Sequence, residues 1–344
     1  MKLKNKKYLL FLLVVNIFLK ADPYFTVSSV SHNFIFGYDS NPLRLSDGEI
    51  SSKNNFLYKD DRYIHSRFFQ HAIKINFFGY IDKKRTNYNL SFKYKNHFDN
   101  KKKTNFLLSV KIDQQLGKYR HLYFSYLVLP NLYLRNYGDS DLVVEYGPTS
   151  FINELLASKF TIEKLSLAYE HPIKKRVSAI KLGYLFEQQL FDRNFTEFDL
   201  KLNGVYVNLS YKKKNNRVSF YFENLHADNV SFLDGSIATA EDYRGYNQKR
   251  FRFNISTQFK SKDKLGMSVD VYDRHYNSNI IEDVLHFRRK HIDSTISFWY
   301  KWKNHTIKIA NRQRITQSPE SWVEDLKSFK RYIITYQYEL KTKL

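Results

Sequence analysis

Two pairs of arginines stand at alternate positions in the chain, Arg250 with Arg252 and Arg312 with Arg314. Alternate side chains of a β-strand point to the same side, so each pair places two guanidinium groups on one wall. Two such groups can clasp a phosphate or a carboxylate through bidentate hydrogen bonds. These four residues are therefore the sharpest candidates for an anion-binding function.

The segments that carry these arginines have the two-residue hydrophobic period of β-strands. Phe251, Phe253 and Ile255 alternate with polar residues, as do Phe106, Leu108, Val110 and Ile112 in another segment. This pattern is typical of a sheet with one apolar and one wet face. It predicts fourteen strands, at 30–38, 68–81, 86–96, 105–114, 118–134, 155–170, 177–188, 195–211, 217–226, 249–260, 265–276, 291–302, 305–316 and 329–342.

The apolar parity changes in two of these predicted strands, between Ile162 and Leu165 and again around Asn203-Gly204. One inserted residue reverses the face to which the following side chains point, so both changes predict β-bulges. An alternative at Asn203-Gly204 is a tight hairpin turn that splits 195–211 into two short strands. The predicted connections alternate between long and short along the whole chain.

The two ends of the sequence indicate where such a sheet would reside. Met1 to Ala21 has a basic start followed by a 12-residue apolar core, which predicts a secretory signal peptide. Residues 22–344 then form a single domain. Phe329 to Leu344 places Tyr332, Ile334, Tyr336, Tyr338 and Leu340 on one parity.

This last stretch resembles the terminal strand of bacterial outer-membrane β-barrels, with Leu344 where that class usually has Phe. The resemblance implies an all-β fold, a closed antiparallel transmembrane barrel of about 14 strands, within a range of 12–16. It also implies short periplasmic turns, long external loops, and an apolar face turned to outer-membrane lipid. The terminal strand would be read by the barrel-assembly machinery and would close on the first strand. The resemblance is to a broad porin-like class and carries no family-specific motif.

In such a barrel the face opposite the apolar parity lines the lumen, and it is rich in basic residues. The candidate pore-lining residues are Lys74, Lys93, Lys95, Lys111, Lys181, Arg250, Arg252, Arg274, Lys308, Arg312 and Arg314. Fixed positive charge in a narrow passage concentrates anions and retards cations. The alternative interpretation is that these residues pair with lumenal carboxylates, among them Glu187, Glu223, Asp270 and Glu339, and stiffen a filled barrel.

Composition argues against several other classes of protein. The formal net charge is +22, but the basic residues are scattered, with no recognition helix or zinc finger, so we expect no nucleic-acid partner. The chain has no Cys, which removes thiol catalysis and thiolate metal sites. No hydrolase, nucleotide-binding or zinc-protease motif occurs, so no catalytic residue, metal or cofactor is predicted. A lipase-like barrel is the weakest alternative, since its residues would converge only in space.

These observations predict a passive porin-like channel for small, preferably anionic, solutes. The eight residues Asp22 to Ser29 that precede the first strand are too few for a plug domain. An inward-folded loop at 39–67 or 227–248 would narrow the passage. The rival hypothesis is a non-conducting barrel that displays its loops as an adhesin, a structural protein or a partner in a secretion or assembly complex.

Overall fold

The fold is known from a computed structural model of the chain. It describes residues 26–51, 64–137, 156–230 and 243–343. The predicted signal peptide, residues 1–21, lies outside the described residues, as do parts of three long loops. In the described part, no helix has the length and apolar character needed to cross a membrane.

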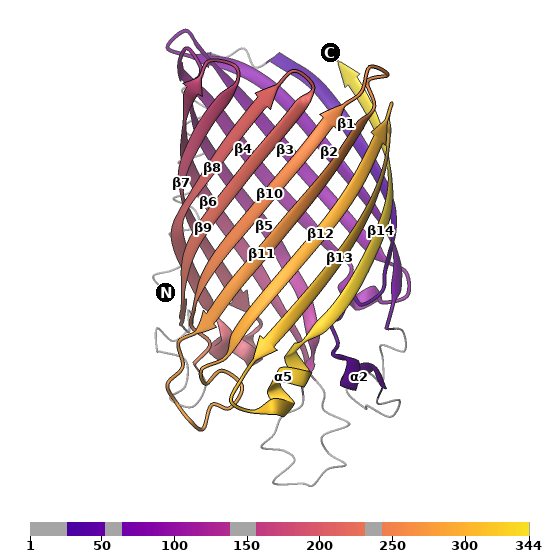
Figure 1. Cartoon of the computed structure of the whole chain (residues 1–344), viewed down its shortest axis with the longest axis vertical. Helices are drawn as coiled ribbons and strands as arrows, with labels where there is room; N and C mark the ends of the chain where they lie inside the picture. The colour runs from indigo at the N-terminus through magenta and orange to yellow at the C-terminus, as the bar shows by residue number, and fades with distance from the viewer. Residues whose placement is uncertain (1–25, 52–63, 138–155, 231–242, 344) are drawn as a thin grey trace.

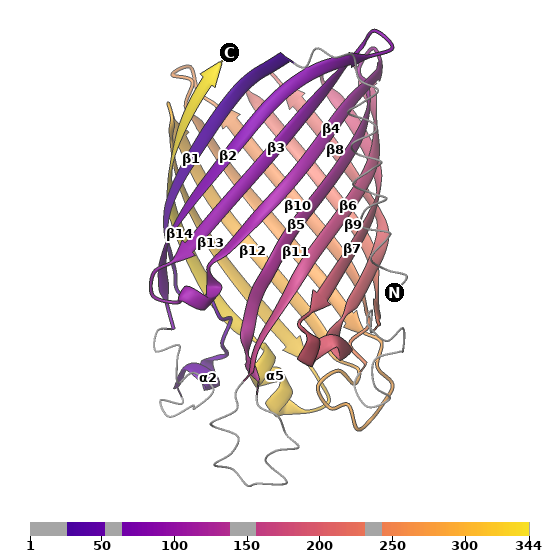
Figure 2. The ribbon, with the colours of Figure 1, turned by 180° about the vertical axis from the view of Figure 1, so that it is seen from behind.

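Fourteen strands form one closed antiparallel sheet, in which each strand pairs with its neighbours in the chain and β1 also pairs with β14 (Figures 1 and 2). The prediction of a closed antiparallel barrel of about fourteen strands is confirmed. The strands are β1 (Thr26–Asp39), β2 (Ser66–Ile81), β3 (Lys84–His97), β4 (Asn105–Gly117), β5 (Arg120–Tyr137), β6 (Leu156–Lys174), β7 (Ser178–Phe191), β8 (Leu200–Lys213), β9 (Asn216–Asn229), β10 (Tyr246–Gln258), β11 (Lys264–Tyr276), β12 (Lys290–Trp302), β13 (His305–Gln317) and β14 (Phe329–Lys343).

The seam between β1 and β14 keeps an unbroken register from Ser29 opposite Lys343 to Asp39 opposite Ile333. At one end it is reinforced by side chains. The Nε of Arg331 donates to Asp39 at 2.8 Å, and a second guanidinium nitrogen donates to the other carboxylate oxygen. Because the described strands close on themselves, none of them has an unpaired edge. A strand in contact with lipid needs such pairing, since lipid offers no hydrogen-bond partner to the backbone.

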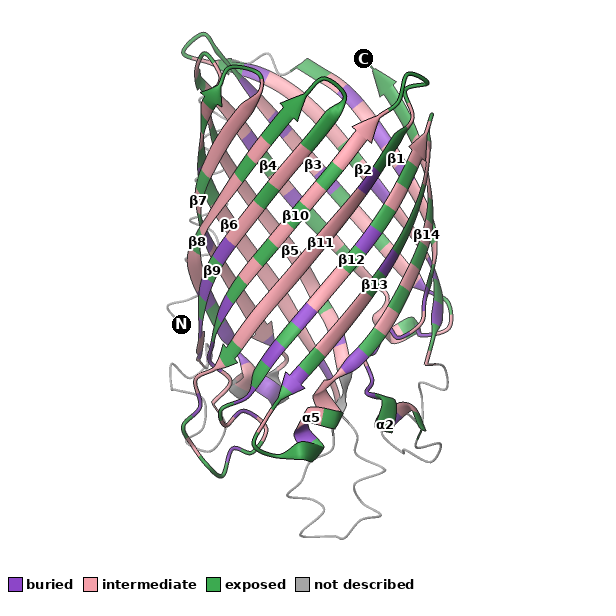
Figure 3. Ribbon diagram, in the orientation of Figure 1, coloured by how far each residue is buried: buried purple, intermediate pink, exposed green. Residues whose placement is uncertain are grey.

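The outer surface is apolar, and the lumenal face is polar over most of its length, with apolar side chains near the loop end. Val205 is 57% exposed, Phe298 54% and Ile309 52%, although all three are strand residues. Exposed and covered positions alternate along the strands (Figure 3). Large exposed apolar side chains on a closed barrel mark a lipid-facing surface, as in outer-membrane barrels.

The two rims of the barrel differ in the length of their connections. At the turn end the connections run from two residues, as at 82–83, to five residues at 259–263. The loop end carries connections such as 40–65 and 318–328, with helices α2 (Asp47–Ser51) and α5 (Ser321–Lys327) and the 3-10 turns η2 (Lys101–Lys103) and η3 (Arg193–Phe198). The alternation of long and short connections matches the prediction. Strand β8 begins at Leu200 because the residues just before it form η3.

Both predicted bulges are wrong. Strand β6 pairs with β7 without a register shift from Phe160 to Pro172, and β8 pairs continuously with both neighbours through Asn203-Gly204. The alternative hairpin turn at Asn203-Gly204 is excluded by the same pairing. The parity changes because the lumen itself turns apolar near the loop end. Apolar side chains there, such as Leu202, face inward while the strand keeps its phase.

Candidate functional site

The loop half of the lumen holds a cavity of about 500 Å³ that is lined by residues from β5 to β13 and from the loops. Nine cationic side chains line it against three carboxylates, those of Glu187, Glu223 and Asp293. The cations are Arg44, Lys164, Arg244, Arg250, Arg274, Arg289, Arg312, Arg314 and Lys327. The barrel therefore concentrates positive charge at one level of its interior.

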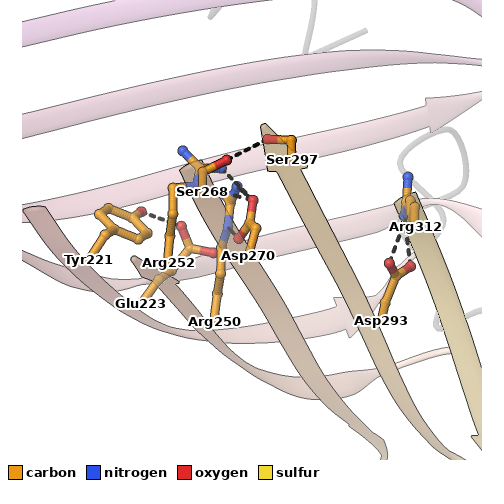
Figure 4. A network of polar contacts seen from close by, with 9 residues as sticks. All are labelled: Tyr221, Glu223, Arg250, Arg252, Ser268, Asp270, Asp293, Ser297 and Arg312. Carbon is orange, nitrogen blue, oxygen red and sulfur yellow. Dashed lines mark hydrogen bonds and ion pairs between the residues drawn. The ribbon is translucent and has the colours of Figure 1, made fainter. Parts of the chain in front are cut away.

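The first arginine pair of the sequence, Arg250 and Arg252, binds a carboxylate of the protein itself. Arg250 donates from Nε and Nη2 to the two oxygens of Asp270, at 2.9 and 2.8 Å, and Arg252 donates to Oδ2 at 2.7 Å. Figure 4 shows Asp270 between the two guanidinium groups. The guanidinium carbon of Arg250 also lies 4.4 Å from the centre of the Tyr272 ring. The sequence pattern predicts that both side chains lie on one face of the strand, and there they share the carboxylate of Asp270.

The second pair, Arg312 and Arg314, does the same with Asp293 on the neighbouring strand β12. Arg312 donates to both carboxylate oxygens at 2.8 and 2.7 Å (Figure 4). Arg314 donates to Oδ2 at 3.0 and 3.2 Å. Asp293 is only 4% exposed. Two guanidinium groups on one buried carboxylate leave a local excess of positive charge that faces the cavity.

Arg44 reaches the same cavity from the loop that follows β1. Asn41 fixes this loop, because its amide accepts from the Leu45 N–H and donates to the carbonyls of Leu45 and Lys330. Leu43 and Leu45 pack with the buried Tyr133. Arg44 has a left-handed backbone, with φ of 60°. The segment from Leu43 to Leu45 therefore turns into the mouth of the barrel, within one of the two loops that the sequence suggested as a constriction.

The surroundings of Arg44 are crowded with like charge. Burial, together with the nearby guanidinium groups of Arg312, Arg314 and Arg331, lowers the pKa of Arg44 well below its usual range. Asp293 acts in the opposite direction. Within the described ranges, the Arg44 side chain has no carboxylate at ion-pair distance. An added anion at this level would relieve that repulsion.

Two further arginines have polar or aromatic neighbours in place of a carboxylate. Arg274 donates to Gln248 Oε1 at 2.7 and 3.2 Å and lies 3.9 Å from the centre of the Tyr246 ring. Arg289 lies 3.9 Å from the centre of the Tyr276 ring and donates to the Leu285 carbonyl. Among the residues that the structure describes, neither has a carboxylate within ion-pair distance.

A histidine stands beside this group in the loop between β11 and β12. His286 Nδ1 lies 2.8 Å from Asp283 Oδ1, and the ring packs on Tyr276. Burial lowers the pKa of His286 to about 4, helped by Arg289 and Arg244 and opposed by Asp283. The imidazole is therefore neutral at physiological pH and adds no charge to the cavity.

The predicted lysines lie on the inward face but do not join the arginines. Lys93 lies within electrostatic range of Lys74 and Lys111, so these three form a second basic group on β2 to β4. Lys181 lies 3.3 Å from Glu170 and 3.4 Å from the centre of the Tyr123 ring. The remaining two are separate: the ammonium of Lys95 covers the Phe68 ring at 3.7 Å, and Lys308 stands on β13. Of the eleven candidates, the structure brings Arg250, Arg274, Arg312 and Arg314 to the loop-half cavity.

Several cavity residues were missed from the sequence. Asp293 has the inward parity of its strand, and this signal could have found it. Arg44, Arg244 and Arg289 come from loops, where no periodicity shows the direction of a side chain. In the described ranges, no group of three or more His, Cys, Asp or Glu side chains could hold a metal ion.

Comparisons with known proteins give structural likeness only. No family model and no curated protein matches the sequence. The chain is similar to the outer membrane channel DcaP of Acinetobacter baumannii, with a TM-score of 0.49 and 10% identity over 93% of this chain and 99% of that one. It is also similar to OccAB4 of the same organism, with a TM-score of 0.42 and 9% identity over 93% and 100%. A third similar structure is the outer membrane protein OprD from Pseudomonas aeruginosa, with a TM-score of 0.38 and 6% identity over 94% of this chain and 96% of that one.

Proposed function

We propose that this protein is a passive, porin-like channel of the bacterial outer membrane that favours small anions. The observation that carries the proposal is the excess of nine cations over three carboxylates around one lumenal cavity. In a passage walled by protein, the field of fixed charges is screened less than in bulk water, so anions are concentrated there and cations are retarded. A closed barrel with an apolar outer surface supplies the membrane-spanning frame.

The ion pairs of the lumen refine this proposal. Asp270 and Asp293 each neutralise one unit of charge and hold two arginines in fixed positions. Arg44, Arg274 and Arg289 then supply the charge that a passing anion meets. The aspartates thus act as positioning residues, and the three arginines as the selectivity determinants.

Planar-bilayer recording of the reconstituted protein tests the proposal. Under a KCl gradient we expect a reversal potential that indicates a chloride-to-potassium permeability ratio above one. Arg44→Gln should lower this ratio several-fold, because it removes a charge that the described residues leave uncompensated. The matched control is Arg67→Gln, since Arg67 pairs with Asp99 and its side chain is 72% exposed outside the cavity lining. The control should keep the wild-type ratio.

The rival hypothesis is a closed barrel that displays its loops. Arg44 at the mouth and the Arg–Asp clusters favour it, because both take up space in the lumen. A folded protein that inserts into the bilayer but passes no current would support this alternative and overturn the channel. Cation selectivity would overturn the anion preference alone. Recognition of β14 by the assembly machinery and export by residues 1–21 stay predictions.

A further inference from the structure

One wall of the loop-half cavity is apolar, which is unusual for the lumen of a membrane barrel. Strands β5 to β9 supply this wall. Its apolar residues are Leu132, Phe160, Ile162, Leu200, Leu202 and Leu225, and the same strands also contribute Lys164, Glu187, Gln189 and Glu223. Leu200, Leu202 and Leu225 are each 2–3% exposed and belong to one buried cluster with Tyr246. Leu132, Phe160 and Ile162 are only partly buried and are available to a solute.

The wall across the cavity is cationic. Arg250, Arg274, Arg312 and Arg314 come from β10, β11 and β13, and Arg44 and Arg289 join them from loops. Arg289 is 4% exposed, and its Nε has no hydrogen-bond partner among the described residues. A buried donor without a partner is costly unless a ligand or water supplies an acceptor. The cationic wall is therefore incomplete without an acceptor. The carboxylates that β7 and β9 bring to the cavity already have partners: Glu187 accepts from Lys164 and Gln189, and Glu223 accepts from the Tyr221 hydroxyl.

A solute that satisfies both walls must have two different ends. An inorganic anion would use the arginines and leave the partly exposed Leu132, Phe160 and Ile162 without a contact. A sugar would place hydroxyl groups against Leu132, Phe160 and Ile162, whose side chains offer no hydrogen-bond partner. A carboxylate on an apolar ring fits both, because guanidinium groups bind carboxylates and the ring displaces water from Ile162 and Phe160.

We propose that this cavity is a binding site for organic anions with an apolar body, such as alicyclic or aromatic carboxylates. The inference rests on the proposed channel function for how the solute arrives, but the site itself is defined by its two walls. The cavity, at about 500 Å³, is within the range of small-molecule sites. Burial of two methylene groups of the ring corresponds to about a tenfold gain in affinity.

The test uses three probes that share one ring. Cyclohexanecarboxylate has the charge and the apolar ring, quinate has the same ring and charge but carries four hydroxyl groups, and cyclohexanecarboxamide has the ring without the charge. Each is added to the channel in a planar bilayer, and block of the chloride current is measured. Cyclohexanecarboxylate should half-block at about a tenfold lower concentration than quinate. The carboxamide should not block in the same range.

Two variants separate the walls. Ile162→Asn makes the apolar wall polar at a partly exposed position, and it should bring the two half-blocking concentrations to within about twofold. Arg44→Gln should raise both concentrations and leave their ratio unchanged. The matched control is Leu107→Asn, which introduces the same amide into the lumenal face of β4 away from this cavity. It should keep the wild-type ratio.

The outcomes distinguish this inference from the channel proposal. Equal block by quinate and cyclohexanecarboxylate in an anion-selective channel overturns the bipartite site and leaves the channel intact. If no current is seen, calorimetric binding of the same three probes to the detergent-solubilised barrel measures the ratio directly. Selective binding without conduction supports the site and overturns the channel, and binding without selectivity overturns both.

Discussion

The two halves of the lumen are built on the same alternation and hold different chemistry. The loop half has arginines clamped by aspartates and faced by leucines. The turn half holds a second cavity, of about 530 Å³, whose wall is mainly Asn, Ser and Tyr, with two lysines and Asp113. The comparison shows that the barrel fold requires apolar residues only at the outward positions. The residue types at the inward positions can therefore differ between the two halves. In the proposed channel, selection of the solute would take place in the loop half of the lumen.

The polar contacts of the turn half are short and mostly uncharged. Asn89 donates to Asn76 Oδ1 at 2.6 Å, and the hydroxyls of Ser166 and Tyr206 lie 3.1 Å apart. The net value of a neutral hydrogen bond is about 1 kcal/mol. Removing a partner from a buried ion pair costs more, because the other charge is then left in a poorly solvated place.

The largest expected effect is that of Asp293→Asn in the loop half. It leaves Arg312 and Arg314 without their carboxylate, and we expect the free energy of unfolding to fall by about 3–5 kcal/mol. The matched change in the turn half is Asp113→Asn. Asp113 pairs with His121 at 2.6 Å, and both side chains are about a third exposed or less. That change should cost about 1 kcal/mol or less.

Denaturant unfolding of both variants in detergent micelles measures the difference. Equal losses of unfolding free energy would contradict the expected difference between the two halves. The Arg312–Asp293–Arg314 cluster would then not behave as a buried ion pair. Arg67→Gln, on the outer surface, provides the baseline for loss of an exposed pair.

A smaller effect is expected from acid at the loop end. Because burial lowers the pKa of His286 to about 4, the folded loop binds fewer protons than the unfolded chain between pH 6.5 and 4. The stability that neutral His286 confers is complete above pH 6.5 and is lost as pH falls through this window, by up to about 3 kcal/mol. Unfolding at pH 7 and at pH 4.5 measures this loss.

The control for this pH dependence is His286→Gln, which cannot take up a proton. Its stability should differ less between the two pH values than that of the wild type. If the variant shows the same pH dependence as the wild type, another residue is the titrating group and His286 does not cause the loss of stability.

The smallest effect is expected from Tyr206→Phe in the turn half. The variant loses the hydrogen bond to Ser166 but keeps the ring that packs over Gly183, where a Cβ would lie 2.3 Å from the Tyr206 ring. We expect a loss of about 1 kcal/mol in unfolding free energy and an unchanged permeability ratio. A changed ratio would mean that the turn half also contributes to selectivity.

The fold was predictable because lipid and water impose a strict period of two on each strand. All fourteen predicted strands are present, with ends displaced by a few residues. The bulge predictions failed at Ile162 and at Asn203-Gly204 for one reason. The period was assumed to separate apolar from polar at every level, whereas the loop half of the lumen is itself apolar on β5 to β9.

The site was less predictable. The spacing of Arg250 with Arg252 and of Arg312 with Arg314 correctly placed each pair on one face, but it could not show that Asp270 and Asp293 already occupy them. Arg44 and Arg289 belong to loops, whose course depends on tertiary contacts such as those of Asn41 and Tyr276. Predicting which residues share the cavity also requires the register between strands, because the lining residues come from nine strands that meet only in the closed barrel.

The seam has a consequence for the order of events in folding. The loop that carries Arg44 is anchored to β14 through the Asp39–Arg331 pair and through the bond from Asn41 to the Lys330 carbonyl. These contacts join residues almost three hundred positions apart, so they form only when the first and last strands meet. An unclosed intermediate would lack the Arg44 charge at its mouth. In the proposed channel, the charge of Arg44 would therefore reach the mouth in the same step that closes the sheet, and a late assembly intermediate would conduct ions without selecting among them.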